Sequence, residues 1–261
     1  MAEGAADLLQ WQNGNYLVLI DYFSCYIEVC NLPAGTSAKQ TIARFKAVFA
    51  RHGCLEILVT DNGLQFSCQE FFQFARDYDF THVTSSPRYP RSNGDAKRAV
   101  RTVKSLLEKG GDLHKALLAY RSTPLAHRAS PAQLLMGRRI RTPVPVLPDH
   151  LQPQWPDLKA FRDKDTSLKL QQLQTFNRRH RARGMPPLQP GQQVWIKPTH
   201  TKGTVIGPAS TPRSYEVETQ EGGQMRRNRS HHRGVPGTPT SGNMTVTRSG
   251  RLSKAPEKLD L

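Results

Sequence analysis

The sequence lacks the segments that would carry a protein into or across a membrane. Residues 1–7 contain no basic stretch followed by an apolar one, which excludes a secretory signal peptide. No apolar run approaches the roughly 18 residues that a membrane-spanning helix needs. We therefore expect an intracellular protein with no membrane partner.

Cysteine is scarce among the 261 residues, and its spacing gives no sign of zinc binding. The sequence holds four cysteines, Cys25, Cys30, Cys54 and Cys68, with no Cys-x-x-Cys pair and no histidine at zinc-finger spacing. Such a pattern excludes a zinc finger and a dense disulfide framework. We expect reduced thiols, most of them buried.

Acidic residues are also few relative to basic ones. The chain contains 37 Lys and Arg against 21 Asp and Glu, which gives a formal net charge of +16. An excess this large predicts a polyanionic partner, of which nucleic acid is the commonest. Two alternatives stay open on charge alone: a basic protein without such a partner, and one that docks on anionic lipid.

The first 141 residues alternate strand-like and helix-like segments. Asn13-Gly14 is a hairpin signal, and the apolar run 16–21 suits a strand buried on both faces. Thr36-Ser37 and Gly53 bound a helix, and Ser67 with Glu70 forms a capping box for the next one. The predicted strands are 6–11, 16–21, 26–30, 55–60 and 81–84, and further helices are predicted at 95–109 and 113–121. This order predicts an α/β domain.

Beyond residue 141 the composition changes several times. Prolines cluster up to Pro156, a polar helix with a basic end is expected at 157–183, and short β-like runs broken by Gly and Pro follow. Trp195 is interpreted as the core aromatic of this β-module rather than as a base-stacking platform. The predicted division is a core (1–141), a linker with a basic helix (142–187), a small β-barrel (188–233) and a disordered tail (234–261).

Two aspartates are placed where carboxylates would need cations nearby. Asp7 lies in the first predicted strand and Asp61 closes the fourth. If these strands are adjacent, the two side chains converge on a site for Mg²⁺ or Mn²⁺. Paired divalent ions about 3.5–4 Å apart are the usual machinery for in-line displacement at phosphorus. The alternative, that Asp61-Asn62-Gly63 is only a turn, stays open on spacing alone.

Three segments of the core form motifs: YLVLIDYFS at 16–24, VTDNGLQF at 59–66 and SSPRYPRSNG at 85–94. They resemble integrases of gypsy-class LTR retrotransposons, and the resemblance spans about residues 5–141. It implies an RNase H-like fold, a five-stranded mixed sheet with flanking helices, followed by a small SH3-like DNA-binding barrel. It also implies DNA integration by strand transfer, in which a DNA 3′-hydroxyl attacks a target phosphodiester.

The resemblance further implies a catalytic triad of two aspartates and a glutamate. Asp7 and Asp61 match the aspartates, whereas the glutamate position falls on Lys97. An ammonium has no lone pair for Mg²⁺ and repels the ion, so Lys97 should block at least one metal site and impair catalysis. Asp95 precedes Lys97 by two residues, which on a helix turns it about 200° away and makes it a poor substitute.

Basic residues mark the expected nucleic-acid contacts. On the helix at 95–109, Lys97, Arg101 and Lys104 share one face, although an ordinary solvated face is the alternative. Eleven Lys and Arg against three acids between residues 176 and 234 predict sequence-independent phosphate binding. The residues expected to bind DNA are Arg98, Arg101, Lys104, Arg178, Arg179, Arg181, Arg226, Arg227 and Arg229.

The segment before Asp7 is shorter than the resemblance implies. Related integrases carry a zinc-binding His/Cys domain there, whereas six residues precede Asp7 in this sequence. We therefore expect an N-terminally truncated integrase core, and a domesticated gene, a decayed element and an incomplete gene are left open. The expected partners are DNA and further copies joined through the core, in the nucleus. The alternative is a non-enzymatic chromatin- or RNA-binding module.

Overall fold

The computed structural model divides the chain into two compact units. The larger comprises Met1–Met185 and Ser210–Pro212, and the smaller comprises Pro186–Ala209 and Arg213–Leu261. The main boundary lies inside the segment that composition predicts as linker and basic helix. The structure describes residues 2–33, 35–85, 94–109, 111–126, 129–179, 184–197, 199–209, 211, 213–234, 245–246 and 252–253. Among the helices of these ranges, none combines the length and the apolar character that crossing a membrane requires.

The larger unit is built on a five-stranded mixed sheet. Its strands lie in the order β3-β2-β1-β4-β5; β2 is antiparallel to both β3 and β1, whereas β4 is parallel to β1 and to β5. This confirms the predicted α/β fold. The strands are β1 (Glu3–Trp11), β2 (Gly14–Asp21), β3 (Ile27–Asn31), β4 (Ile57–Thr60) and β5 (Thr81–Thr84).

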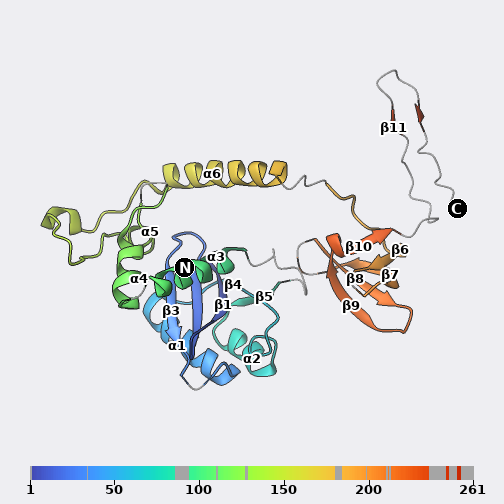
Figure 1. The fold of residues 1–261 in the computed structure, drawn as a ribbon, viewed down its shortest axis with the longest axis horizontal. Helices are drawn as coiled ribbons and strands as arrows, with labels where there is room; N and C mark the ends of the chain where they lie inside the picture. Colours follow the sequence, from blue (N-terminus) through green and yellow to red (C-terminus); the bar gives the residue numbers. More distant parts are fainter. Residues whose placement is uncertain are drawn as a thin grey trace. The chain divides into compact units, whose positions relative to one another are not determined.

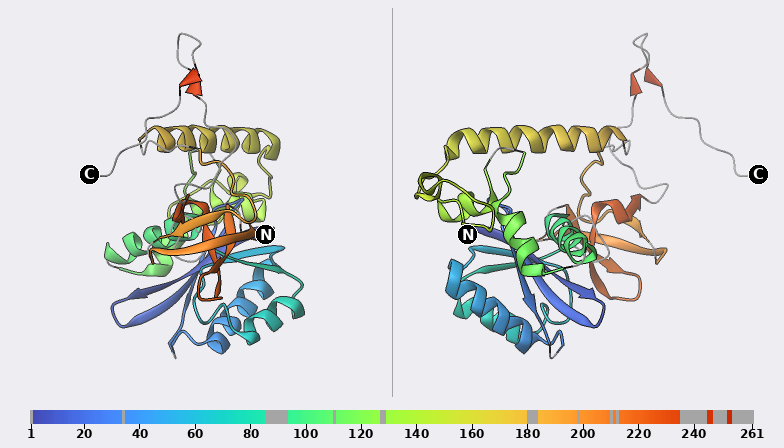
Figure 2. Two further views of the ribbon diagram at one scale, coloured as in Figure 1. Left: turned by 90° about the vertical axis from the view of Figure 1, so that its right-hand side faces the viewer. Right: turned by 60° about the vertical axis from the view of Figure 1, so that its left-hand side comes forward.

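Helices cover both faces of this sheet (Figure 1 and Figure 2). Strand β2 shows the division, because Leu17 and Leu19 belong to one buried cluster whereas Val18 and Ile20 belong to the other. The run 16–21 is therefore buried on both faces, as predicted. The first cluster includes side chains of α1 (Ala38–His52) and α2 (Gln69–Asp77), and the second includes side chains of α3 (Gly94–Glu108) and, at its margin, α4 (Leu113–Ser122).

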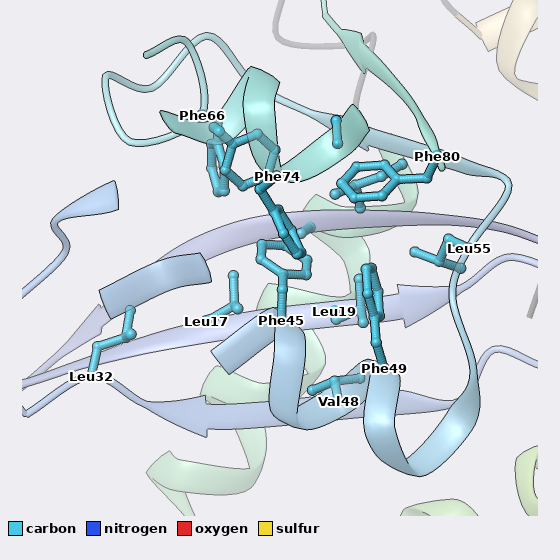
Figure 3. Close-up of a cluster of buried hydrophobic side chains, with 14 residues drawn as sticks. Leu17, Leu19, Leu32, Phe45, Val48, Phe49, Leu55, Phe66, Phe74 and Phe80 are labelled. Carbon is cyan, nitrogen blue, oxygen red and sulfur yellow. The ribbon is translucent and has the colours of Figure 1, made fainter. Parts of the chain in front are cut away.

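A group of phenylalanines fills the space between the sheet, α1 and α2 (Figure 3). Phe45 of α1 is fully buried, and its ring centre lies 5.7 Å from that of Phe71 and 6.1 Å from that of Phe74. Phe66, in the loop after Asp61, is also fully buried, with its ring 5.4 Å from Phe71. Aromatic pairs of this kind add about 0.5–1.5 kcal/mol each beyond the area they bury. The cluster thus fixes the loop that carries Asp61.

The predicted start of the first helix is confirmed, whereas that of the second is wrong. Of the predicted cap pair Thr36-Ser37, Ser37 is the N-cap of α1, and Gly53 ends that helix at φ 82°, as predicted. The predicted capping box of Ser67 is wrong, because α2 begins one residue later, at an N-cap of Cys68 with no side-chain hydrogen bond. The Ser67 hydroxyl instead donates to the carbonyl oxygen of Gly63 at 2.9 Å. It therefore closes the loop after Asp61 instead of opening the helix.

The remainder of the larger unit carries shorter elements and one long helix. These are α5 (Pro131–Met136), the 3₁₀ turn η1 (Pro148–Leu151) and α6 (Leu158–Arg179). The polar helix expected from residue 157 corresponds to α6. Phe161, in the first turn of α6, is buried and packs edge-on against Phe23 with ring centres 5.2 Å apart, which holds the start of the helix against the larger unit.

The smaller unit is a five-stranded antiparallel sheet, consistent with the predicted small barrel. Its strands lie in the order β10-β6-β7-β8-β9, and its core consists of Leu188, Val194, Ile196, Val205 and Val217. In the segment predicted as a disordered tail, β11 (Thr245–Val246) and β12 (Leu252–Ser253) pair with each other. The five strands are β6 (Gln193–Ile196), β7 (Thr201–Pro208), β8 (Ser214–Thr219), β9 (Gln224–Asn228) and β10 (His232–Gly234).

The interpretation of Trp195 as the core aromatic of this unit is wrong. Val194 and Ile196 are both fully buried in the core cluster, whereas Trp195 is partly exposed and lies outside it. Successive side chains of a strand point to opposite faces. With Val194 and Ile196 inside, Trp195 is turned to the outer face.

The expectation of mostly buried thiols holds only in part. All four cysteines are free; Cys25, Cys30 and Cys68 are half-buried, and Cys54 is exposed. Burial raises the pKa of the Cys25 and Cys30 thiols, which keeps both protonated at neutral pH.

Candidate active site and nucleic-acid interface

The two aspartates singled out in the sequence lie on neighbouring strands. In the parallel ladder of β1 and β4, Ala5 is the partner of Val59, and the same register continued by two residues places Asp7 opposite Asp61. Ala5 and Leu9 pack in the cluster shared with α3, so alternation along β1 puts Asp7 on the α3 side of the sheet. Val59 of β4 packs in the same cluster, and Asp61 follows directly after the end of β4, where its charge acts on the Asp7 carboxyl.

Lys97, in the first turn of α3, shares this site. Burial raises the pKa of the half-buried Asp7 carboxyl, and the charge of Asp61 raises it further. Two effects oppose them: the Leu8 N–H donates to Asp7 Oδ1 at 2.9 Å, and the Lys97 ammonium attracts the carboxylate. The structure therefore brings both Asp61 and Lys97 within electrostatic reach of Asp7, where the ammonium is a counter-ion to the Asp7 carboxylate.

The backbone around Asp61 is held by polar contacts on three sides. Asp61 Oδ1 accepts from the Gly63 N–H at 2.9 Å, so the residue also starts the turn that was the alternative interpretation. The Thr60 hydroxyl donates to the Asp61 carbonyl at 2.8 Å and lies 2.8 Å from His82 Nε2. Asn62 Nδ2 donates to the Ser85 carbonyl. Asp61 is thus a turn residue whose carboxylate is also close enough to Asp7 to raise the pKa of the Asp7 carboxyl.

Thr60 and His82 were missed in the sequence. Thr60 is the last residue of β4 and directly precedes Asp61. His82 lies on β5, the strand next to β4, and is therefore two strands away from Asp7 on β1. Burial lowers the pKa of His82 to about 4, which keeps its ring neutral near pH 7. The only signal in the sequence was a polar residue inside a strand-like run, and that is too common to identify a supporting residue.

The residues present do not complete a site for two divalent ions. Asp7 and Asp61 supply carboxylate oxygens, but the ammonium of Lys97 cannot coordinate a metal. Within the described ranges, no group of three or more His, Cys, Asp or Glu side chains is placed to hold a metal ion. Asp95 is engaged elsewhere, because its Oδ1 lies 3.0 Å from Arg98 Nη1 along the surface of α3.

The outer face of α3 is basic over two turns. Lys97, Arg98, Arg101 and Lys104 are all exposed. The buried side is formed by Ala96, Ala99 and Val103, with Val100 and Leu107 half-buried beside them.

The other cations expected to bind DNA have different surroundings. Arg178 and Arg179 are exposed at the end of α6, and Arg181 lies outside the described residues. Arg226 is paired across the strands with Glu216. Arg227 is half-buried opposite Tyr215, on the side of the core.

Arg229 has a structural contact on each side of its guanidinium. Its Nε donates to the Pro186 carbonyl at 2.7 Å, and its Nη1 donates to the His232 carbonyl at 3.0 Å. These two bonds join the entry segment of the smaller unit to β10. Arg229 therefore contributes to the stability of that unit whatever else it binds.

Comparison with known proteins identifies a family that matches part of this chain. Residues 8–90 match the family described as "Integrase core domain". An uncharacterized protein of Caenorhabditis elegans is 38% identical over 146 residues, which cover 52% of this chain and 11% of that protein. The Gag-Pol polyprotein of walleye dermal sarcoma virus is 28% identical over 138 residues, 48% of this chain and 8% of the polyprotein. The chain thus spans about a tenth of the length of these relatives.

One solved structure shares the fold across most of the chain. It is the simian T-cell lymphotropic virus intasome in complex with PP2A regulatory subunit B56 gamma, with a TM-score of 0.60. The likeness covers 91% of this chain and 80% of that one at 15% identity, so it concerns the fold alone.

Proposed function

This chain carries an integrase core domain of the retroviral and retrotransposon type, and from that premise we propose that it is a nucleic-acid-binding protein with impaired strand-transfer activity. The observation that carries the proposal is the position of Lys97 beside Asp7 and Asp61. Strand transfer at a phosphodiester uses divalent ions to stabilise the attacking and leaving oxygens. An ammonium at the third ligand position removes one ligand and repels the ion that the other two would hold.

Lys97 also gives the site an alternative use. Its charge offsets the negative charge that Asp7 and Asp61 would otherwise place together, which is the task of a metal ion in an active enzyme. It also extends the exposed basic face of Arg101 and Lys104 towards the carboxylates. The change that harms catalysis thereby favours phosphate binding.

Restoring the missing carboxylate tests the impairment. We expect Lys97→Glu to gain strand transfer by on the order of 10–100-fold or more, because a ligand to the metal is restored. The assay compares both proteins on labelled donor and target DNA with Mg²⁺ and with Mn²⁺. Lys104→Glu is the matched control, since it makes the same charge change two turns along the same face of α3. Strand transfer by the unmodified chain at the level of Lys97→Glu would contradict the proposal.

Nucleic-acid binding is tested by its dependence on salt. Each phosphate neutralised by Lys or Arg contributes about 0.9 to the slope of log affinity against log salt concentration. We expect replacing Arg178 and Arg179 by Gln to lower that slope by about 1.8, or two contacts. Replacing Lys159 and Lys164 by Gln is the control, because both are exposed near the other end of α6. A flat salt response of the unmodified chain would contradict nucleic-acid binding altogether.

The second candidate function is a non-enzymatic chromatin- or RNA-binding module. The same Lys97 favours this function. Its expected result differs from that of the first proposal: the chain binds nucleic acid, but Lys97→Glu gains no strand transfer. We also propose that DNA is the first ligand to test, that copies of the chain associate through the core, and that the protein is nuclear.

A further inference from the structure

Three residues form a row across the outer face of the smaller unit. Trp195 of β6 is paired in register with Arg233 of β10 on one side and with Lys202 of β7 on the other. Neighbouring strands lie about 4.8 Å apart, so the row spans roughly 10 Å. The Lys202 ammonium lies 5.1 Å from the centre of the Trp195 ring, within the range of a cation–π contact.

The core of this unit does not explain the position of Trp195. Val194 and Ile196 fill the inner positions of β6, and the indole is partly exposed on the other side. A large aromatic side chain contributes most to stability when it is buried. Its placement between two cations on an outer face therefore favours a role in binding.

The three strands that carry this row present no carboxylate on its face within the described residues. The nearest acidic residue in the register is Glu218 of β8, which is paired with Thr204, two residues along β7 from Lys202. Lys197, directly after β6, is exposed as well. The outward residues of these three strands are Gln193, Trp195, Lys202, Thr204, Ile206 and Arg233.

We propose that Trp195, Lys202 and Arg233 form a binding site for single-stranded nucleic acid. A base stacks on the exposed part of the indole, and the two cations take the flanking phosphates. The ligand is single-stranded because the bases of a duplex are stacked on one another and have no face free for Trp195. This proposal rests on the nucleic-acid binding proposed above and adds the strand state that the smaller unit prefers.

Binding measurements on the full chain test the site. We expect Trp195→Ala to weaken binding of a labelled 12-nucleotide oligothymidylate by about 5- to 150-fold, the range for loss of one stacked base. Affinity for a duplex of equal length should change by less than about 2-fold, and Trp195→Phe should keep most of the single-strand affinity. Ile206→Ala is the matched control, because Ile206 is 41% exposed on the same face, outside the row.

The outcomes separate this site from the broader function. Equal affinity of Trp195→Ala and the unmodified chain for oligothymidylate, or an equal loss for both ligands, would overturn the stacking site while leaving nucleic-acid binding intact. Failure of the unmodified chain to bind either ligand would refute nucleic-acid binding itself.

A spectroscopic measurement reports on the indole without removing it. The chain contains three tryptophans, so replacing Trp11 and Trp155 by Phe leaves Trp195 as the single emitter. We expect its fluorescence to be quenched as oligothymidylate is added and to be unchanged by the duplex. Emission that stays constant while oligothymidylate binds would overturn the proposal.

Discussion

His82 lies on β5, beside the strand that leads to Asp61, and makes the stability of the fold depend on pH. Its Nε2 is 2.8 Å from the Thr60 hydroxyl, which in turn donates to the Asp61 carbonyl. Burial lowers the pKa of His82 to about 4, against about 6.5 for an exposed histidine. As pH falls below about 6.5, the unfolded chain takes up this proton before the folded chain does. The contribution of His82 to stability is therefore fully present above that pH and is lost as pH falls towards 4.

Replacing His82 should flatten the acid limb of the stability profile. We expect His82→Gln to lose less unfolding free energy than the unmodified chain between pH 7 and pH 4.5, by at most about 1.4 kcal/mol per pH unit and less for a partly exposed ring. Urea unfolding at the two pH values measures the difference. His114→Gln, at an exposed position of α4, is the control and should follow the unmodified chain within about 0.5 kcal/mol. Identical losses in His82→Gln and the unmodified chain would contradict the expectation.

The candidate site could be predicted from the sequence only in part. Asp61 lies in a motif, and the residues around Lys97 mark the third ligand position. The approach of Asp7 to Asp61 depends on the parallel pairing of β1 with β4, which joins segments far apart in the chain. No local pattern dictates that pairing, and for the same reason the support of Asp61 by His82 was not foreseen.

Among the elements, those set by local rules were predicted best. Helix α1 begins at a serine cap and ends at a glycine with positive φ, and both signals are local. Ser67 and Trp195 were misinterpreted because two local rules competed. The Ser67 hydroxyl closes the loop with Gly63 instead of capping α2. The size of Trp195 suggested a core position, but the alternation of Val194 and Ile196 around it was the better guide.

The edge strand β3 is fastened by contacts that no sequence pattern shows. Glu28 is buried, with its carboxylate 2.7 Å from His52 Nε2, 3.2 Å from Arg121 Nη2 and 3.5 Å from Arg51 Nη2. The Arg121 guanidinium also donates twice to the Ile27 carbonyl, at 3.0 and 2.7 Å. Because these residues come from β3, the end of α1 and α4, the cluster holds both helices to the edge of the sheet. A buried carboxylate needs such partners, since burying it unpaired is costly.

In the whole molecule, the two units have separate sets of buried side chains. The clusters around Phe45 and around Val18 belong to the larger unit, and the cluster around Ile196 belongs to the smaller. The candidate carboxylates and the exposed face of α3 are in the larger unit, whereas the row of Trp195 is in the smaller. The candidate strand-transfer site and the proposed single-strand site therefore belong to different units, so that substitutions can alter one without changing the other.

Calorimetry of core variants tests this separation. We expect two thermal transitions, because each unit has its own core. Ile196→Ala should destabilise the smaller unit by about 2–5 kcal/mol and Phe45→Ala the larger by about 3–5 kcal/mol, since both side chains are fully buried and leave cavities. Each variant should lower the midpoint of one transition and leave the other within about 1 °C, because a change confined to one core leaves the unfolding equilibrium of the other unaltered. A single transition, or a shift of both midpoints by either substitution, would show that the units unfold together and that the two functions cannot be separated by substitution in one core.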